Sequence, residues 1–92
     1  HFLFIDMPTV CSFRGIRIYI NYSEHLQPHF HAEYGEYECT ININDIDIFS
    51  GSLPHKQLKM VLGWAALHQE ELKEEWYLAQ LRKYLFPIEP LK

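Results

Sequence analysis

Gly35 lies between two runs of residues in which apolar and polar positions alternate in step. Followed by Glu36, it suits a two-residue type II′ hairpin turn, because that turn needs a positive φ at its first central position. One face of the predicted hairpin then carries the apolar or aromatic pairs Tyr34–Tyr37, Ala32–Cys39 and Phe30–Ile41, and the other carries the polar pairs Glu33–Glu38, His31–Thr40 and His29–Asn42. A slip of one residue would turn both faces over, so this agreement predicts an antiparallel hairpin in this register.

A second turn is expected at Ile43-Asn44-Asp45-Ile46, since Asn and Asp tolerate the positive φ of a type I′ turn. This turn again pairs apolar with apolar and polar with polar residues, in Ile43–Ile46, Ile41–Ile48 and Asn42–Asp47. Residues 28–50 are therefore predicted to form a three-stranded meander. The alternation over residues 13–22, where three isoleucines share one side, predicts a fourth strand.

A helix is predicted after the meander. Ser52 is a favoured N-cap, and Pro54 fits the first helical turn, where its missing N–H needs no partner. Apolar positions then recur at three- and four-residue steps, at Leu58, Val61, Leu62, Ala65, His68, Leu72, Trp76 and Ala79. A single helix of about 30 residues would be roughly 45 Å long, whereas an eight-residue strand spans only about 27 Å. We therefore expect the helix to bend, to break near His68 or to extend beyond the sheet. Such an extension would need something to pack against, because it carries Trp76, Tyr77, Leu81 and Tyr84.

The fold class that follows is α+β: a four-stranded, mainly antiparallel sheet (a meander) with its isoleucine-rich face covered by a long C-terminal helix. Ninety-two residues correspond to one domain. We take residues 7–92 as that domain, with Met7 as the natural start, and residues 1–6 as an addition from cloning or an upstream extension. A chain of this size has a thin core, so large exposed patches would indicate a homo-oligomer or another partner.

Composition argues against several functional classes. The net charge of −4 disfavours a phosphate-binding surface, although Arg14 and Arg17 lie close together, so nucleic-acid binding is the weakest hypothesis. The four glycines are scattered and form no phosphate-binding loop. No apolar run reaches the roughly 18 residues of a membrane span. Two distant cysteines, Cys11 and Cys39, make no disulfide framework, so the reducing cytoplasm is the expected location.

Three of the six histidines, His25, His29 and His31, fall within seven residues. His29 and His31 are two positions apart on a predicted strand, so both leave the same face and can bind one Zn²⁺ or Cu²⁺. His25, in the preceding loop, could fold back as a third ligand, and a nearby carboxylate could supply an oxygen. The alternative is a polar, partly exposed sheet face on which His29 is hydrogen-bonded across to Asn42 or Asp47.

The row His29–Asn42–Asp47 also permits an acid–base role, because a carboxylate that holds a histidine orients it as a general base. No obvious nucleophile accompanies the row. Thr40 is an ordinary strand residue, and Cys39 points to the apolar face, where we expect it to be buried and inert.

Two further features have plain structural interpretations. His68 lies on the apolar stripe of the helix, where a core or rim histidine with a satisfied hydrogen bond is expected. Glu33 opposite Glu38 is a like-charge pair, which is mildly destabilising unless a cation lies there. Arg17 from the neighbouring strand would supply that cation, or a metal ion would.

These residues also form a longer pattern. Its segments are Met7-Pro8-Thr9-Val10, Phe13-x-Gly15-Ile16-x-Ile18, His25-x-x-Pro28-His29-Phe30-His31-Ala32-Glu33-Tyr34-Gly35, Gly51-Ser52-Leu53-Pro54 and Trp64-Ala65-x-Leu67-His68-x-x-Glu71-Leu72-x-x-x-Trp76. Together they resemble a small bacterial family catalogued as domain of unknown function 4160, from residue 7 to about residue 90, with His-x-x-Pro-His-Phe-His as the specific part. Gln27 departs from the pattern, because members often have two consecutive prolines there.

The resemblance implies a cytoplasmic bacterial protein with a protein partner, because members are commonly encoded beside a second small protein in an arrangement similar to toxin–antitoxin modules. Our first hypothesis is an interaction protein from such a two-gene toxin–antitoxin-like or stress module. Its binding surface would be the end of the helix or the residues His25, His29, His31, Asn42 and Asp47. The second hypothesis is a small metal-dependent hydrolase or nuclease, with zinc held by His29 and His31.

Overall fold

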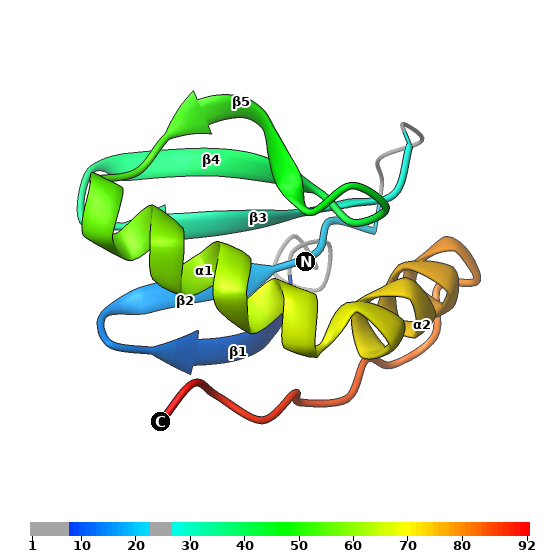
Figure 1. The fold of residues 1–92 in the computed structure, drawn as a ribbon. Coiled ribbons are helices and arrows are strands. Elements are labelled where there is room, and N and C mark those ends of the chain that lie inside the picture. Colours follow the sequence, from blue (N-terminus) through cyan, green and yellow to red (C-terminus); the bar gives the residue numbers. More distant parts are fainter. Residues whose placement is uncertain (1–7, 23–26) are drawn as a thin grey trace.

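In the computed structural model, which describes residues 8–22 and 27–92, five antiparallel strands form one sheet in chain order (Figure 1). The strands are β1 (Thr9–Phe13), β2 (Ile16–Tyr19), β3 (His29–Tyr34), β4 (Tyr37–Asn42) and β5 (Asp47–Ser52), followed by the helices α1 (His55–Leu67) and α2 (Gln69–Gln80). The predicted α+β class is confirmed, but the predictions of four strands and of one long helix are wrong.

The additional strand comes from a turn at Arg14 and Gly15. We predicted a single strand over residues 13–22, but these two residues have positive φ angles of 51° and 79°, as in a type I′ hairpin turn. Phe13 pairs with Ile16 across the turn, and the chain before it becomes β1. A residue other than glycine seldom adopts a positive φ, so the arginine at this position gives no sequence signal for a turn.

The predicted register of the central hairpin is confirmed at all six residue pairs between β3 and β4. Gly35 has a φ of 57°, as a type II′ turn requires at its first central position. The next register is confirmed as well, with Ile41 opposite Ile48 and Asn42 opposite Asp47. The alternation of apolar and polar residues predicts the register because one face of the sheet is apolar and the other is polar.

The turn between β4 and β5 has a different form from the prediction. It comprises residues 43–46, and the N–H of Ile46 donates to the carbonyl of Asn42 over 2.8 Å. The positive φ, 51°, falls on Ile46 and not on Asn44 or Asp45, so the predicted type I′ turn is wrong. The Asn42 side chain accounts for the difference, because its Oδ1 accepts the N–H groups of Asn44 and Asp45 over 2.9 and 3.1 Å.

A longer last strand delays the start of the helix. Phe49 is an extra residue in β5 between two paired positions, which is a β-bulge. The strand then continues to Ser52, which pairs with Glu38. The predicted N-cap role of Ser52 is therefore wrong, and α1 begins at His55, after Pro54.

The helical segment breaks at His68, which was one of the alternatives expected from its length. The backbone of His68 has φ −116° and ψ 24°, outside the helical region. Its N–H still donates to the carbonyls of Trp64 and Ala65, and its ring Nδ1–H donates to Glu71 Oε1 over 2.5 Å. His68 is thus the half-buried histidine with a satisfied hydrogen bond that the sequence predicts. Of the helices that the structure describes, neither has the length and apolar character needed to cross a membrane.

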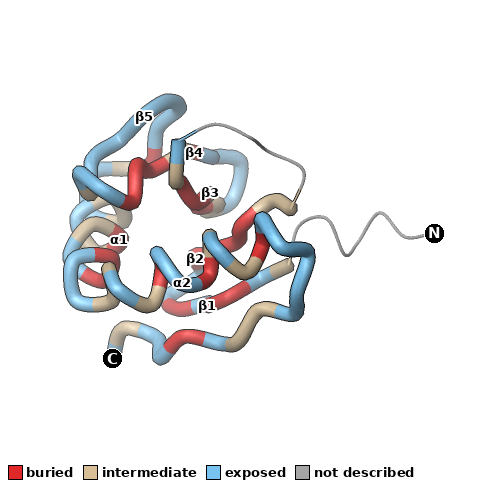
Figure 2. Tube along the Cα trace, turned by 90° about the vertical axis from the view of Figure 1, so that its right-hand side faces the viewer, coloured by how far each residue is buried: buried red, intermediate tan, exposed pale blue. Residues whose placement is uncertain are grey.

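The core lies between α1 and the sheet, while α2 extends past one end of the sheet (Figure 1). Its largest fully buried apolar side chains are Trp64, Phe30, Ile16, Ile18, Ile20, Ile41, Ile43 and Leu72. The chain after α2 returns beside β1, where the N–H of Ile88 donates to the carbonyl of Val10 over 2.8 Å. This tail closes one edge of the sheet, whereas β5 at the other edge is exposed along its length (Figure 2).

Candidate functional site

His29 and His31 leave the same side of β3, as predicted, with ring centroids 5.1 Å apart and ring planes at 80°. The alternate residue Phe30 packs against Trp64 of α1, so the two histidines belong to the opposite face of the sheet, called the outer face below. His25, the third histidine of the predicted cluster, lies outside the residues that the structure describes.

His29 is buried, which differs from the exposed position that we expected. Its side chain is 2% exposed, and its Nδ1–H donates to the carbonyl of Gln27 over 2.7 Å. The indole of Trp76 packs against it with ring centroids 4.9 Å apart. The break at His68 explains this burial, because it lets α2 turn and lie against the start of β3. Sequence spacing alone could not reveal the contact, since it depends on the direction of α2.

Asn42 and Asp47 lie opposite His29 in the register but use their side chains to stabilise their own turn. The buried Asn42 caps that turn, as described above. Asp47 Oδ1 accepts the N–H of Ile48 over 2.8 Å and is exposed. The expected hydrogen bond from His29 to Asn42 or Asp47 is replaced at Nδ1 by the Gln27 carbonyl. The row therefore does not form the histidine–carboxylate arrangement of a general base.

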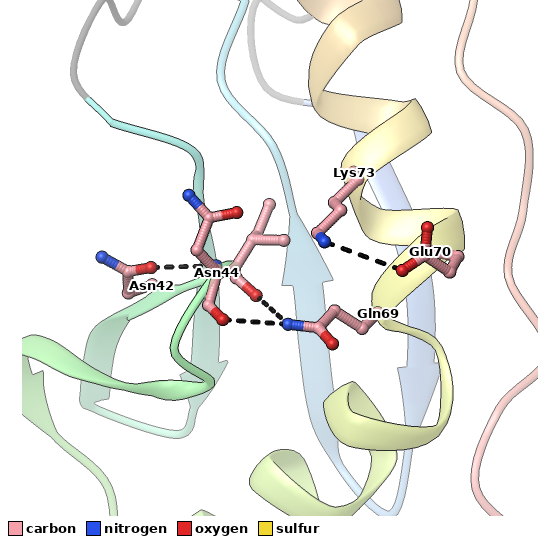
Figure 3. Close-up of polar contacts among 6 residues, drawn as sticks. Asn42, Asn44, Gln69, Glu70 and Lys73 are labelled. Atoms are coloured by element: carbon pink, nitrogen blue, oxygen red, sulfur yellow. Dashed lines mark hydrogen bonds and ion pairs between the residues drawn. The ribbon is translucent and has the colours of Figure 1, made fainter.

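The turn that Asn42 stabilises is also fastened to the second helix. Gln69, the first residue of α2, donates from Nε2 to the carbonyls of Ile43 and Asn44 over 2.8 and 3.0 Å (Figure 3). One turn further along α2, Lys73 Nζ lies 3.6 Å from Glu70 Oε2. Asn42 is thus part of the connection between the sheet and α2, which is a structural role.

Tyr19 is a residue of the outer face whose importance the sequence did not reveal. Its ring stacks on His31, its partner across β2 and β3, with centroids 4.9 Å apart and planes at 14°. The guanidinium carbon of Arg17 lies 4.3 Å from the centroid of the same ring. The hydroxyl of Tyr19 donates to a carboxylate oxygen of Glu38. Burial raises the pKa of Tyr19 above its ordinary range, and the hydrogen bond to Glu38 acts in the same direction.

The like-charge pair of Glu33 and Glu38 is neutralised from β2, as expected. Arg17 Nη1 lies 3.5 Å from Glu33 Oε1, and Arg17 Nε–H donates to Thr9 Oγ1 over 2.6 Å. Tyr19 donates to Glu38, the other member of the pair. Because Arg17 and Glu33 are each more than a third exposed, their ion pair contributes at most about 1 kcal/mol. The expectation that Arg17 supplies the cation is confirmed.

The chemistry available on the outer face is limited. His31, which is half-buried, has its Nδ1 in a hydrogen bond of 3.4 Å with Thr40 Oγ1. The Nδ1 of His29 is likewise in a hydrogen bond, with the carbonyl of Gln27. In residues 8–22 and 27–92, no three His, Cys, Asp or Glu side chains gather in the manner of a metal site. Cys39 faces the core, and burial raises the pKa of its thiol to about 11, so it is protonated and a poor nucleophile at neutral pH.

A second candidate surface lies at the end of α2. Tyr77, Leu81 and Tyr84, called the helix-end patch below, are 63%, 47% and 97% exposed. Tyr77 belongs to α2, Leu81 is the C-cap of that helix, and Tyr84 lies beyond it. The expectation that part of the helix end would lack cover is confirmed for these three residues, whereas Trp76 turns inward against His29.

Comparison with known proteins identifies a matching family. A family model described as "Domain of unknown function (DUF4160)" matches residues 15–77. The matched segment contains Arg17, Tyr19, His29 and His31 and ends at Tyr77, the first residue of the helix-end patch. No curated protein and no solved structure matches the chain.

Proposed function

The chain belongs to the DUF4160 family, and on that basis we propose that it is an interaction protein, one component of a two-gene toxin–antitoxin-like or stress module in a bacterial cytoplasm. Its task would be to bind the second protein of the module. The gene arrangement expected from the family supports a protein partner, and the surface of this chain supports a place for that partner to bind.

The helix-end patch is the observation that carries the proposal. The opposite side of α2 is used within the chain, because Leu72 and Ala79 are fully buried. Tyr77 lies on the exposed side of α2, and Leu81 and Tyr84 follow at its end, so three large apolar side chains are presented to water in this part of the chain. Tyrosine is enriched in protein interfaces, because its ring covers a large area at a small cost in side-chain entropy. An exposed group of two tyrosines and a leucine is typical of such an interface.

The charges beside the patch indicate the chemistry of its partner. Arg82 and Lys83 are exposed and lie between Leu81 and Tyr84 in the sequence. The chain as a whole carries a net charge of −4, so two adjacent cations at this point are a local departure. We therefore expect the partner to offer an apolar surface with acidic groups at its margin, which would also favour fast association.

Size-exclusion chromatography of the two gene products tests the proposal. The chain, mixed at micromolar concentration with the protein encoded by the neighbouring gene, is expected to elute as a complex of both. Separate elution of the two proteins would contradict the proposal. So would elution of this chain alone as a dimer that substitutions in the helix-end patch convert to a monomer, because the patch would then bind a second copy.

A metal-dependent hydrolase or nuclease is the second candidate. The observation that favours it is the proximity of the His29 and His31 rings, whose centroids are 5.1 Å apart. Elemental analysis of protein purified without a histidine tag tests this candidate. It predicts one zinc or other transition-metal ion per chain and a lower melting temperature after chelation. A metal-free protein whose melting temperature changes neither with zinc nor with a chelator would exclude a metal-dependent enzyme.

A further inference from the structure

Glu75 is a fully buried carboxyl group that connects α2 to the tail of the chain. Its exposed fraction is 0%, although Glu70 and Glu74 of the same helix are exposed. Oε1 accepts the N–H of Phe86 over 3.0 Å. Oε2 has no hydrogen-bond partner among the residues that the structure describes. A buried oxygen in this state is costly, and far more so when it carries a charge, so it requires an explanation.

The groups around Glu75 favour its neutral form. Glu71 and Glu74 of the same helix add negative charge nearby. Tyr22, which follows β2, is close enough for the charge of Glu75 to raise its own pKa. From the tail, the Phe86 amide provides a single neutral donor. Burial raises the pKa of Glu75 to about 7, the Phe86 amide opposes that change, and Glu74 and Glu71 reinforce it.

Two side-chain hydrogen bonds tie the segment from Leu81 to Phe86 to the rest of the chain, in addition to the backbone hydrogen bonds that Leu81, Arg82 and Lys83 make to the last turn of α2. One is the hydrogen bond between Phe86 and Glu75. The other is the hydroxyl of Tyr22, which donates to the carbonyl of Lys83 over 2.7 Å. Leu81 and Tyr84, two members of the helix-end patch, lie in this segment. Leu81 is also held by backbone hydrogen bonds to Tyr77 and Leu78, so the burial of Glu75 bears on the position of Tyr84 and not on the whole patch.

We propose that Glu75 is a proton-controlled latch, which holds the segment from Tyr84 to Phe86 against α2 when it is neutral and releases that segment when it is ionised. Once ionised, the carboxylate would need contact with water, because Oε2 has no donor among residues 8–22 and 27–92, and movement of the segment would admit water. The effect on partner binding rests on the proposed function, whereas the latch itself is a property of this chain alone.

Nuclear magnetic resonance of the full chain between pH 5.5 and 8.5 tests the latch. The Phe86 amide resonance is expected to titrate with a midpoint near pH 7, whereas Glu75→Gln should abolish that titration. Glu74→Gln is the matched control: it removes an exposed neighbouring carboxyl and should keep the titration. A Phe86 amide that does not change over this range, or that titrates alike in wild type and Glu75→Gln, would overturn the proposal.

Two additional measurements keep the test decisive. Tyr22→Phe removes the hydrogen bond to the carbonyl of Lys83 and leaves Glu75 in place, so the pH-dependent change at Phe86 should become larger. If Glu75→Gln did not fold, this variant and the wild-type titration would decide the matter. Affinity for the partner is expected to fall about tenfold from pH 6 to pH 8 in wild type and to stay constant in Glu75→Gln. A partner that binds at no pH would contradict the proposed function, while the Phe86 titration would still decide the latch.

Discussion

The indole of Trp76 packs against the imidazole of His29, with ring centroids 4.9 Å apart and ring planes at 50°. This contact joins the middle of α2 to the first residue of β3. It explains why His29, a histidine of the family pattern, is buried.

Trp76→Ala should destabilise the protein by roughly 2–4 kcal/mol, because a large, partly buried side chain is removed and His29 loses its cover. The neighbouring Tyr77→Ala is the control, and a change within about 0.5 kcal/mol is expected, since that ring is mostly exposed. Urea denaturation measures both free energies of unfolding. Equal losses in the two variants would contradict the assigned packing.

Gly51→Ala should cost more than about 2 kcal/mol. Gly51 has a φ of 77°, and an added Cβ would lie 2.3 Å from the carbonyl oxygen of Glu38 in β4, so the strand has to shift. Gly63→Ala provides the contrast, because its Cβ would meet nothing within 4 Å and the site is inside α1. That variant should be more stable by about 1 kcal/mol, through helix propensity. Thermal unfolding of the pair checks the opposite signs.

Tyr19→Phe should cost about 1 kcal/mol, since the hydroxyl loses Glu38 while the stacking on His31 is kept. Because Glu38 is exposed, water can replace the lost donor, and the cost stays modest. A double-mutant cycle with Glu38→Ala, which removes the acceptor, isolates the interaction. A coupling energy near zero would show that the two groups do not interact in solution.

Glu75 should make stability fall as the pH rises. Its pKa is raised from 4.5 to about 7 in the folded protein, so the protonated form is the one that folding stabilises. The contribution is complete below pH 4.5, is lost between pH 4.5 and 7, and changes little above pH 7. The free energy of unfolding of Glu75→Gln should exceed that of wild type by up to about 3 kcal/mol at pH 8 and by little at pH 4.5. Denaturation curves at several pH values give this difference, and a difference independent of pH would refute it.

The register of the central hairpin could be predicted because two chemically distinct faces must agree at once. A shift of β3 against β4 by one residue would bury Glu33 and expose Phe30, so the sequence permits only one alignment. The same reasoning extended to Asn42 opposite Asp47, even though the turn itself was assigned the wrong type.

The candidate site was harder to predict, because it depends on contacts between distant segments. Because Arg14 adopts a positive φ that its residue type does not suggest, the turn between β1 and β2 could not be predicted. The break at His68 decides where Trp76 lies, and hence the burial of His29, but the apolar stripe continues through it without interruption. The stacking of Tyr19 on His31 requires the alignment of β2 with β3, and no turn in the sequence specifies that alignment. The helix-end patch, in contrast, follows from the length of the helical segment compared with the sheet.

Isothermal titration calorimetry with the protein encoded by the neighbouring gene tests the central claim most directly. The double variant Leu81→Ser and Tyr84→Ser should weaken binding at least a hundredfold, because its apolar contacts lie in the helix-end patch. The matched control is Phe49→Ser, which removes an exposed apolar side chain from β5 and should bind as wild type does. Wild-type affinity in the double variant, or a loss of affinity in Phe49→Ser alone, would contradict the assignment of the helix-end patch as the binding surface.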